Sequence, residues 1–554
     1  ELVAILGGSG AGKSTLIGAL TGMNPATSGS ILINGRDLYH EYEVFRCMMG
    51  YVPQDDIVHV DLTVEEVLTY TARLRMPEDT SKEEIKSTVE QVMMEVELTE
   101  RRDILVKNLS GGQRKRVSIG VELITRPGLF FLDEPTSGLD PGLERIMMEL
   151  VRKLADQGRT ILLVTHATFN IKLCDKVLFL ADGGKLAFFG TPAEAIIYFE
   201  ATDFADIYQK ISTEKTPDQW ARIFKTSESY KSNVACRDYG INQKINTESD
   251  KKSIGKGSAK ISSIRQWMIL TERFARIMSR DKANLGLLLM QPLIIAALIV
   301  MIFYASAPLF NSREYKNEDL IITSQVIASG GFQDIQDKIQ SETNRRFNMS
   351  ICIALMIFSA IWLGTSNSAQ VIVKEIPIYQ RERLVNLHIA PYLFSKVFVL
   401  SVICLIQTAI FIGVITIGLG LPQIVPVFLA FFLVSITSVM MGLTVSAVSS
   451  NADKAMTAVP LLLVPQIILA GAIVPMQAIK PAVFQWIFYL AISKWGYELV
   501  GGRIIDINRR AALDHPLKAL DGIEPLHWMV LAIFAVMFCF LTTLAMIRKD
   551  RNFN

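Results

Sequence analysis

A glycine-rich loop close to the start of the chain is the first segment whose residues could do chemistry. The octapeptide Gly7-Gly8-Ser9-Gly10-Ala11-Gly12-Lys13-Ser14 fits G-x-x-x-x-G-K-[ST], and Thr15 follows it. Glycines let backbone N–H groups turn toward phosphate oxygens, the lysine reaches the outer phosphates, and the serine hydroxyl suits Mg²⁺. The loop lies between an apolar strand-like run, 2–6, and an apolar helical pattern, 15–20. These residues predict a site for a nucleoside triphosphate with Mg²⁺.

Two adjacent carboxylates, Asp133 and Glu134, stand at the end of the apolar run 129–132. Asp133 would hold Mg²⁺ through water, while Glu134 would polarise an attacking water as general base. His166 follows another apolar run, 160–164, and could bond to the γ-phosphate. A strand that happens to end in acids and a purely structural histidine are the alternatives. Together with the glycine loop, the pattern favours hydrolysis.

Residues 108–116, with the sequence NLSGGQRKR, resemble the signature sequence of ATP-binding cassette (ABC) proteins. They lie between the glycine loop and the carboxylates, as that family requires. Gln54 resembles the glutamine of the family's Q-loop, Asp140 lies in a segment similar to its D-loop, and His166 resembles its switch histidine. The resemblance implies ATP as the nucleotide, catalytic roles for Glu134 and His166, and Mg²⁺ held by Ser14, Gln54 and Asp133.

The signature residues are also predicted to form a second anion cradle. Backbone N–H groups at the start of a helix favour an anion, and the cradle would comprise Leu109, Ser110, Gly111, Gly112 and Gln113. In the family this cradle closes on the ATP of a facing subunit, so the resemblance implies a head-to-tail pair of nucleotide domains. The basic run 114–116 is interpreted as a solvated helix face, and no nucleic acid is expected as a partner.

The composition argues against a purely soluble enzyme. The chain has 554 residues, 50% of them hydrophobic and 20% charged, with a mean hydropathy of +0.32. A soluble protein carries about 25% charged residues. The formal net charge of +2 gives no global attraction to a polyanion. Six scattered cysteines give no paired spacing, which excludes a disulfide framework.

The apolar residues are concentrated after residue 284. Uncharged runs reach the ~20 residues that a bilayer crossing needs, and the alternative of buried core helices does not suit six runs in series. We therefore predict an α/β P-loop nucleotide-binding domain, 1–224, fused to an all-α six-helix transmembrane domain, 285–554. A shorter run, 483–492, is expected to be re-entrant or interfacial. The predicted spans are 285–304, 349–373, 397–419, 425–448, 455–474 and 528–547.

Residues 225–263 are rich in Ser, Lys and Asn and are expected to be a solvated linker. Residues 264–284 predict an amphipathic connecting helix on the cytoplasmic membrane surface, or else a solvated helix packed on the soluble domain. With six spans, the basic loop 374–396 and the C-terminus would share one side with the nucleotide domain. This suits the positive-inside tendency and predicts a cytoplasmic ATP site in a plasma or bacterial inner membrane.

The domain order, the phrases GYVPQDD and SGGQRKRVSIG, and the six spans resemble the G-type (White-like) half-transporters of the ABC-2 exporter class. This resemblance implies a dimer as the smallest working unit, either a homodimer or a heterodimer. The family's aromatic residue that stacks on adenine is missing before the glycine loop, so an N-terminal truncation before Glu1 is expected. The predicted external segments 305–348 and 475–527 lack cysteine, which favours a prokaryotic or unusual member.

The same resemblance implies two further sets of residues. Coupling to the membrane domain would use Glu375, Arg381, Glu382 and Arg383, although a solvated membrane-flanking loop is the alternative. A substrate cavity at the dimer axis would include Phe358, Trp362, Asn367 and Leu462, although these residues could merely pack helices or face lipid. No predicted span contains a charged residue, which favours a lipid or amphipathic hydrophobic substrate.

The leading hypothesis is an ATP-driven exporter. A membrane-anchored ATPase that transmits mechanical force to a partner protein remains the alternative, since the predicted external segments are long. A nonhydrolytic regulator or channel would predict damaged chemical residues, and Glu134 and His166 are intact.

Overall fold

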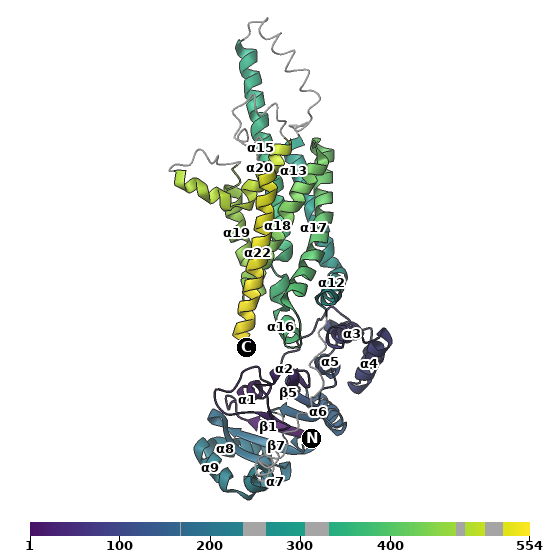
Figure 1. Ribbon diagram of the computed structural model, residues 1–554, viewed down its shortest axis with the longest axis vertical. Helices are drawn as coiled ribbons and strands as arrows, with labels where there is room; N and C mark the ends of the chain where they lie inside the picture. Colours follow the sequence, from purple (N-terminus) through teal and green to yellow (C-terminus); the bar gives the residue numbers. More distant parts are fainter. Residues whose placement is uncertain (167, 236–261, 305–331, 472–481, 505–523, 554) are drawn as a thin grey trace. The chain divides into compact units, whose positions relative to one another are not determined.

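The computed structural model describes residues 1–166, 168–235, 262–304, 332–471, 482–504 and 524–553 (Figure 1). The chain divides into two compact units. The first comprises Glu1–Ile269, Pro377–His388 and Phe553–Asn554, and the second comprises Leu270–Ile376 and Ile389–Asn552.

A six-stranded sheet forms the centre of the first unit. Its order is β4-β5-β6-β1-β7-β8, parallel except for the antiparallel pair β7 and β8. Parallel strands are covered on both faces and are therefore apolar throughout, which is why they could be predicted from short apolar runs. The strands are β1 (Leu2–Gly7), β4 (Met49–Val52), β5 (Leu129–Asp133), β6 (Thr160–Val164), β7 (Lys176–Ala181) and β8 (Lys185–Gly190), with a separate hairpin of β2 (Leu32–Ile33) and β3 (Arg36–Asp37).

The register of this sheet brings the predicted chemical segments to one edge. Both β1 and β5 pair with β6, with Ile5 opposite Val164 and Asp133 opposite the same residue. The carboxyl ends of these parallel strands therefore meet, which is where ligands bind in open α/β sheets.

Several helices of the first unit begin at residues whose side chains cap them. Thr63, Ser81 and Ser110 each form a capping box, in which the side chain accepts from the N3 backbone while the N3 side chain reaches back. These helices are α1 (Lys13–Leu20), α2 (Tyr42–Phe45), α3 (Val64–Arg75), α4 (Lys82–Glu95), α5 (Gly111–Leu123), α6 (Pro141–Asp156), α7 (Pro192–Tyr198), α8 (Phe204–Thr213), α9 (Pro217–Thr226) and α10 (Glu228–Tyr230), with short turns η1 (Thr99–Arg101), η2 (Val106–Asn108), η3 (Ile171–Leu173), η4 (Asp182–Gly184) and η5 (Lys231–Ala235).

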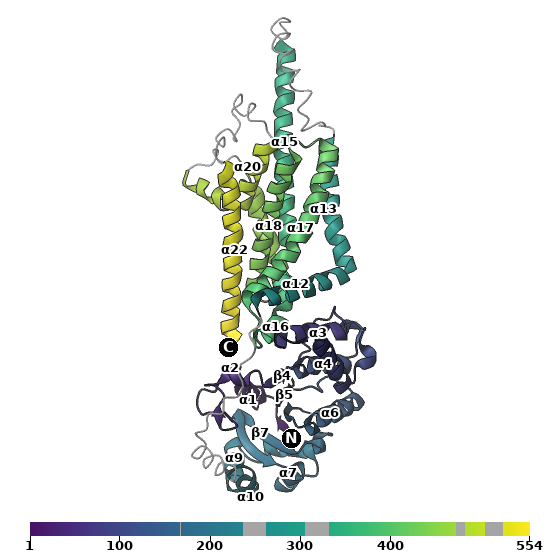
Figure 2. The same ribbon diagram turned by 45° about the vertical axis from the view of Figure 1, so that its right-hand side comes forward.

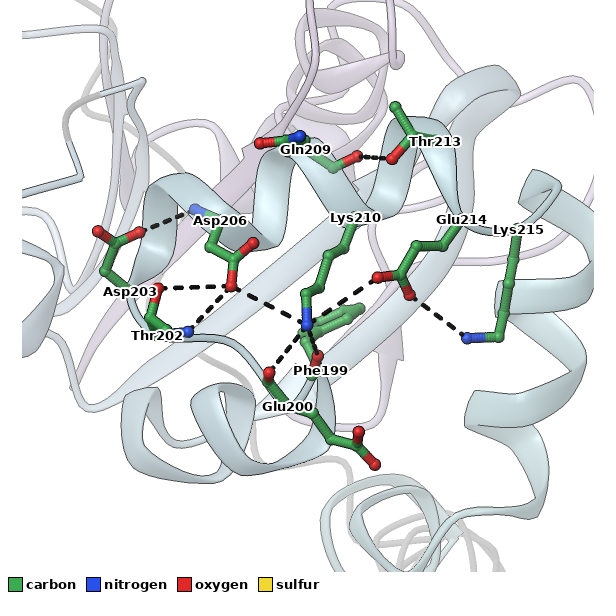
Figure 3. Close-up of polar contacts among 10 residues, drawn as sticks. All are labelled: Phe199, Glu200, Thr202, Asp203, Asp206, Gln209, Lys210, Thr213, Glu214 and Lys215. Atoms are coloured by element: carbon green, nitrogen blue, oxygen red, sulfur yellow. Dashed lines mark hydrogen bonds and ion pairs between the residues drawn. The ribbon is translucent and has the colours of Figure 1, made fainter.

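Lys210 joins α8 to the end of α7. Its Nζ donates to the carbonyl oxygens of Phe199 at 3.2 Å and Glu200 at 2.8 Å, and Asp206 and Glu214 flank it at 3.9 Å (Figure 3). A lysine placed there satisfies carbonyls that the helix end leaves without an internal partner. The contact fixes α8, whose Tyr208 packs its ring 6.1 Å from that of Phe179 in β7.

The predicted linker was placed too early. The unit stays helical through Ala235, and Asn233 in η5 is buried and bonded to Lys176 of β7. The polar composition of 225–235 misled the prediction, because a short helical turn needs few apolar residues once it packs on a strand. The rest of the predicted linker, 236–261, lies outside the described residues.

The second unit is helical. Within the described residues, five helices are long and apolar enough to cross a membrane: Lys282–Phe303, Phe347–Arg383, Ile389–Leu419, Ile424–Val448 and Pro525–Arg551. Helix α13 lies along α17, and α15 along α18 (Figure 2). The elements are α12 (Ser263–Arg280, which begins in the first unit), α13 (Lys282–Phe303), α15 (Phe332–Ser368), α16 (Val371–Arg383), α17 (Ile389–Leu419), α18 (Ile424–Val448), α19 (Ala452–Ile468), η8 (Ala482–Leu490), α20 (Ile492–Ile504) and α22 (Glu524–Phe553).

The fifth predicted span, 455–474, is not confirmed. Helix α19 has 17 residues and ends at Ile468, and 472–474 lie outside the described residues. The predicted short segment 483–492 is helical, as η8 and the start of α20. The predicted external segments 305–348 and 475–527 fall largely outside the described residues.

Two predicted boundaries are wrong. The connecting helix ends at Arg280 rather than at 284, because the Asp281 side chain accepts from the Asn284 backbone N–H at 3.1 Å and starts a new helix there. The predicted loop 374–396 is mostly helix. Its break is confined to 384–388, where Asn386 takes a φ of +87°.

Close packing of α15 against α18 depends on glycine. A methyl group at Gly364 would overlap the Ser435 carbonyl oxygen and lie 2.9 Å from the Ser438 Cβ. At Gly442 on the facing helix, it would overlap the Ser368 hydroxyl. Small residues let helix backbones approach in this way, and they are enriched where membrane helices pack.

We expect Gly364→Ala to destabilise the second unit by about 1–3 kcal/mol, since the added methyl overpacks a tight helix pair. Gly413→Ala on α17 is the matched control, because nothing lies within 4 Å of its added methyl. Thermal inactivation of the two purified variants in detergent checks this, and equal midpoints would contradict it.

Candidate functional site

The glycine loop joins β1 to α1 in a conformation that glycine favours. Gly10 and Gly12 have φ values of +81° and +96°, which L side chains adopt with strain. Lys13 is 7% exposed, and its Nζ donates to the carbonyl oxygens of Gly7 at 2.9 Å and Gly8 at 2.8 Å. Ser14 is exposed in the first turn of α1. The remaining predicted loop residues lie in this turn, with Ala11 buried and Ser9 and Thr15 exposed.

Lys13 lies in the field of both carboxylates. Burial lowers the pKa of Lys13, while the charges of Glu134 and Asp133 act to raise it. The loop therefore carries a lysine cation that already faces the edge where the two acids stand.

Glu134 is held at two points. His166 Nε2 lies 2.9 Å from its Oε1, and Gln54 Nε2 donates to its Oε2 at 3.1 Å. Its φ is +47°, an uncommon conformation for a residue other than glycine, and its backbone N–H donates to Val164 at 3.0 Å. Strained backbone of this kind clusters at functional sites. The structure thus brings together three residues that are more than 30 positions apart in the sequence.

Asp133 has a neighbour that the sequence analysis missed. The Tyr51 hydroxyl lies 3.5 Å from Asp133 Oδ2. Burial, followed by the charge of Glu134, raises the pKa of Asp133. Burial also raises the pKa of Tyr51, so the phenol stays protonated as a donor. Tyr51 lies on β4, which pairs with β5, the strand that ends in Asp133. A prediction of this strand pairing could have identified Tyr51 as a neighbour of Asp133.

The chemistry of the predicted ligands fits a hard cation such as Mg²⁺. The Ser14 hydroxyl, the Gln54 amide and the Asp133 carboxylate all offer oxygen donors, and a cation would relieve the repulsion between Asp133 and Glu134. Within the described residues no group of three or more His, Cys, Asp or Glu side chains surrounds a common point. Mg²⁺ would therefore complete its coordination with phosphate oxygens and water, as it commonly does.

The predicted signature residues begin α5 with a capping box. The Ser110 hydroxyl accepts from the Gln113 backbone N–H at 3.3 Å, and Gln113 Oε1 accepts from the Ser110 backbone N–H at 3.1 Å. Leu109 precedes them, and Gly111 and Gly112 open the helix. In Figure 1, α5 lies on the opposite side of β5 from α1. Asp140 caps α6 by accepting from Gly142 and Leu143, each at 3.0 Å.

Lys115 overturns the interpretation of the basic run 114–116 as a solvated face. Its side chain is buried, donates to the Gln54 carbonyl oxygen and lies 3.3 Å from Asp56 Oδ1. A buried lysine needs such partners, since an unpaired charge in a protein interior is costly. Lys115 therefore ties the signature helix to the segment that carries Gln54.

The predicted coupling residues are split between the two units. Arg381 belongs to the first unit, where its Nε lies 3.8 Å from Glu122 Oε1, and Glu122 pairs with Arg75 at 2.8 Å. Glu382 and Arg383 also belong to this unit, and Arg383 donates to the Leu387 carbonyl at 2.6 Å.

Glu375 belongs to the second unit and has different partners. It pairs with Lys396 at 2.5 Å and accepts from the Tyr392 hydroxyl at 3.2 Å. The four residues are therefore not a single cluster.

The predicted cavity residues lie on α15 and α19. The Phe358 and Trp362 rings are 6.2 Å apart and partly buried. Asn367 donates to Gln407 Oε1 at 2.7 Å, so its amide N–H joins α15 to α17. Leu462 is 37% exposed on α19.

Comparison with known families matches both units. Residues 1–137 match the ABC transporter family, and residues 265–502 match the ABC-2 type transporter family. The chain is 31% identical to the ABC transporter ATP-binding/permease protein Rv1747 of Mycobacterium tuberculosis over 536 residues, 95% of this chain and 56% of that protein. The chain thus spans about half the length of that relative.

Two further relatives share parts of this arrangement. Protein white of Drosophila melanogaster is 26% identical over 528 residues, 90% of this chain and 72% of that protein. The broad substrate specificity ATP-binding cassette transporter ABCG2 of Mus musculus is 39% identical over 212 residues, 37% of this chain and 32% of that protein. The chain is an integral membrane protein of the ABC transporter family, with an ATP-binding domain placed before an ABC-2 type membrane domain as in the White-like G-type half-transporters.

Proposed function

We propose that this protein is an ATP-hydrolysing half-transporter that acts as a dimer and exports a lipid or amphipathic hydrophobic substrate. The observation that carries the proposal is the position of the Glu134 carboxylate, between Gln54 and His166 and at the sheet edge that holds Lys13. An acceptor fixed from two sides is suited to a general base, since it must be aimed at the water that it activates.

Hydrolysis would divide the work among these residues. Lys13 would leave its two loop carbonyls to meet the outer phosphates, and the loop N–H groups would bind the phosphate oxygens. Glu134 would take a proton from the attacking water, while His166 would donate to the γ-phosphate. Ser14, Gln54 and Asp133 would hold Mg²⁺, which neutralises charge on the phosphates when bound.

The second cradle supports a dimer. A chain with the glycine loop at the start of α1 and the signature residues at the start of α5 would have two anion sites, and a second copy in head-to-tail orientation would let both act on one ATP. ATP would then join the two nucleotide domains, and hydrolysis would release them. A homodimer is the simplest arrangement, although a heterodimer satisfies the same geometry.

The proposed coupling path starts at Glu134 and leaves through Gln54. A change at the γ-phosphate would move Gln54, and Lys115 would pass the movement to α5 because it holds the Gln54 carbonyl. Glu122 on the same helix pairs with Arg75 and faces Arg381 of the segment 377–388. Arg381, Glu382 and Arg383 are thus the proposed coupling residues, with Glu375 acting through its own partners.

The proposed substrate class follows from the chemistry of the spans. Their cores are apolar, and the proposed cavity residues Phe358, Trp362 and Leu462 offer aromatic and aliphatic surface. A relative is named for broad substrate specificity, which supports transport rather than force transmission to a partner protein. We propose that the ATP-binding domain and the C-terminus are cytoplasmic, because the end of α22 carries Arg548, Lys549 and Arg551.

Glu134→Gln should lower ATP hydrolysis by about 10²–10⁴-fold, since an amide cannot accept the water's proton. ATP binding should persist, because the binding groups remain. Hydrolysis and equilibrium ATP binding are measured on the same preparation, with Glu149→Gln on the surface of α6 as the matched control. Turnover of Glu134→Gln at the rate of the unaltered protein would remove Glu134 from this role.

Lys115→Met should loosen the Gln54 segment by about 3 kcal/mol, because it leaves the Asp56 charge without its buried partner. Arg145→Met breaks an exposed pair with Glu149 and should cost less than about 1 kcal/mol. Hydrogen–deuterium exchange of the peptide that contains Gln54 measures the local opening free energy. Equal protection of this peptide in both variants would mean that Lys115 does not hold it.

A further inference from the structure

A cavity in the first unit lies apart from the residues assigned to ATP. Its volume is about 550 Å³, within the range of small-molecule sites. The cavity is open to one side and is lined by the end of α3, the start of α4, the end of α5 and the chain between α2 and β4, together with Val385 of the segment 377–388.

Three arginines, Arg46, Arg75 and Arg126, line this cavity together with one carboxylate, Glu84. Arg75 is already neutralised, since both of its terminal nitrogens bond to Glu122, at 2.8 and 3.0 Å. Glu84 caps α4, where hydrogen bonds from Ser81 lower the pKa of Glu84 and hold it ionised. The guanidinium groups that remain available to bind an anion are therefore those of the other two arginines.

Arg46 and Arg126 both have donor capacity to spare. The Arg46 terminal nitrogen lies 2.8 Å from Glu43 and also bonds to Asn386, but its buried Nε has no hydrogen-bond acceptor among the described residues. Arg126 is exposed and donates to the neutral Gln91 amide oxygen at 2.5 Å. A buried donor without a partner costs free energy that an anionic ligand would recover.

The remaining wall is apolar. It includes Met49, Met76, Pro77, Ile124 and Val385. No aromatic side chain lines the cavity among the described residues, so a nucleobase would find no stacking surface there. Guanidinium groups beside aliphatic and thioether surface instead suit a ligand with an anionic head and a single apolar tail.

We propose that this cavity binds a single-chain anionic amphiphile, a phosphate or carboxylate on an alkyl or acyl chain, with its head at Arg46 and Arg126. Val385 would contact the tail, and Arg46 holds the neighbouring Asn386. An occupant would therefore tie the segment 377–388 to α3, α4 and α5. The binding site stands independently of the proposed transport function, because its test reads neither ATP hydrolysis nor transport.

Cys47 provides a direct reporter, since it lines the cavity and is partly exposed. Cys174, Cys352 and Cys404 are buried. The full chain with Cys236→Ser and Cys539→Ser, in nanodiscs of zwitterionic lipid, is treated with a maleimide, and mass spectrometry follows the modification of Cys47. Octyl phosphate is the probe, with inorganic phosphate and octanol as separate arms.

The proposal predicts that octyl phosphate slows the modification of Cys47 in a saturable manner, while phosphate and octanol at equal concentration do not. Arg126→Gln should raise the half-protecting concentration about tenfold, the effect of one charge-assisted hydrogen bond. The exposed Arg222→Gln on α9 should leave that concentration unchanged.

Nanodiscs of anionic lipid distinguish the source of the ligand. Protection without added octyl phosphate would assign the same site to a bilayer amphiphile, and protection by octyl phosphate alone would assign it to a soluble one. Absence of protection in every arm would overturn the proposal. Equal protection by octanol or by phosphate, or an unchanged half-protecting concentration in Arg126→Gln, would overturn it as well.

Discussion

Repulsion between neighbouring carboxylates at the end of β5 is the constraint on which the nucleotide site depends. Asp133 and Glu134 stand side by side, and burial, followed by the charge of Glu134, raises the pKa of Asp133. Each acid therefore needs a positive or donating partner. Lys13 supplies a nearby cation, Tyr51 donates to Asp133, and Gln54 with His166 holds Glu134. An incoming nucleotide with Mg²⁺ would meet carboxylates that are already held in place, while Lys13 would exchange its loop carbonyls for phosphate oxygens.

Contacts that the carboxylates make extend into the rest of the first unit. The glutamine that holds Glu134 is itself held by Lys115 at its carbonyl, and Lys115 belongs to the helix that the signature serine begins. The same helix carries Glu122, which pairs with Arg75 and Arg381. Helix α5 thus joins the proposed anion cradle at its start to the proposed coupling contacts near its end. A rigid helix with fixed contacts at both ends is suited to transmitting a displacement.

The residues of the nucleotide site could be predicted because their types and spacing in the sequence indicate a phosphate-binding site. Local sequence predicts the backbone geometry at three places: the glycine loop, the acids after 129–132 and the serine before α5. Tyr51 and Lys115 could not be found in this way, since their roles arise from strand pairing and burial. Composition located the long apolar helices but misplaced the boundaries at 225 and 284. Packing of 231–235 on a strand extends the first unit past 225, and the Asp281 cap ends the connecting helix before 284. Span 455–474 is not confirmed, since α19 ends at Ile468 and residues 472–474 lie outside the described residues.

The central claim is that ATP is held between two copies of this chain. Pulsed electron paramagnetic resonance between spin labels at the exposed position Arg145, next to the capped start of α6, tests it most directly. In the Glu134→Gln background, ATP with Mg²⁺ should shorten the distance between the labels of the two copies, and removal of nucleotide should restore the longer one. An unchanged distance, or no intermolecular distance in a preparation whose unaltered counterpart hydrolyses ATP at its full rate, would contradict the account.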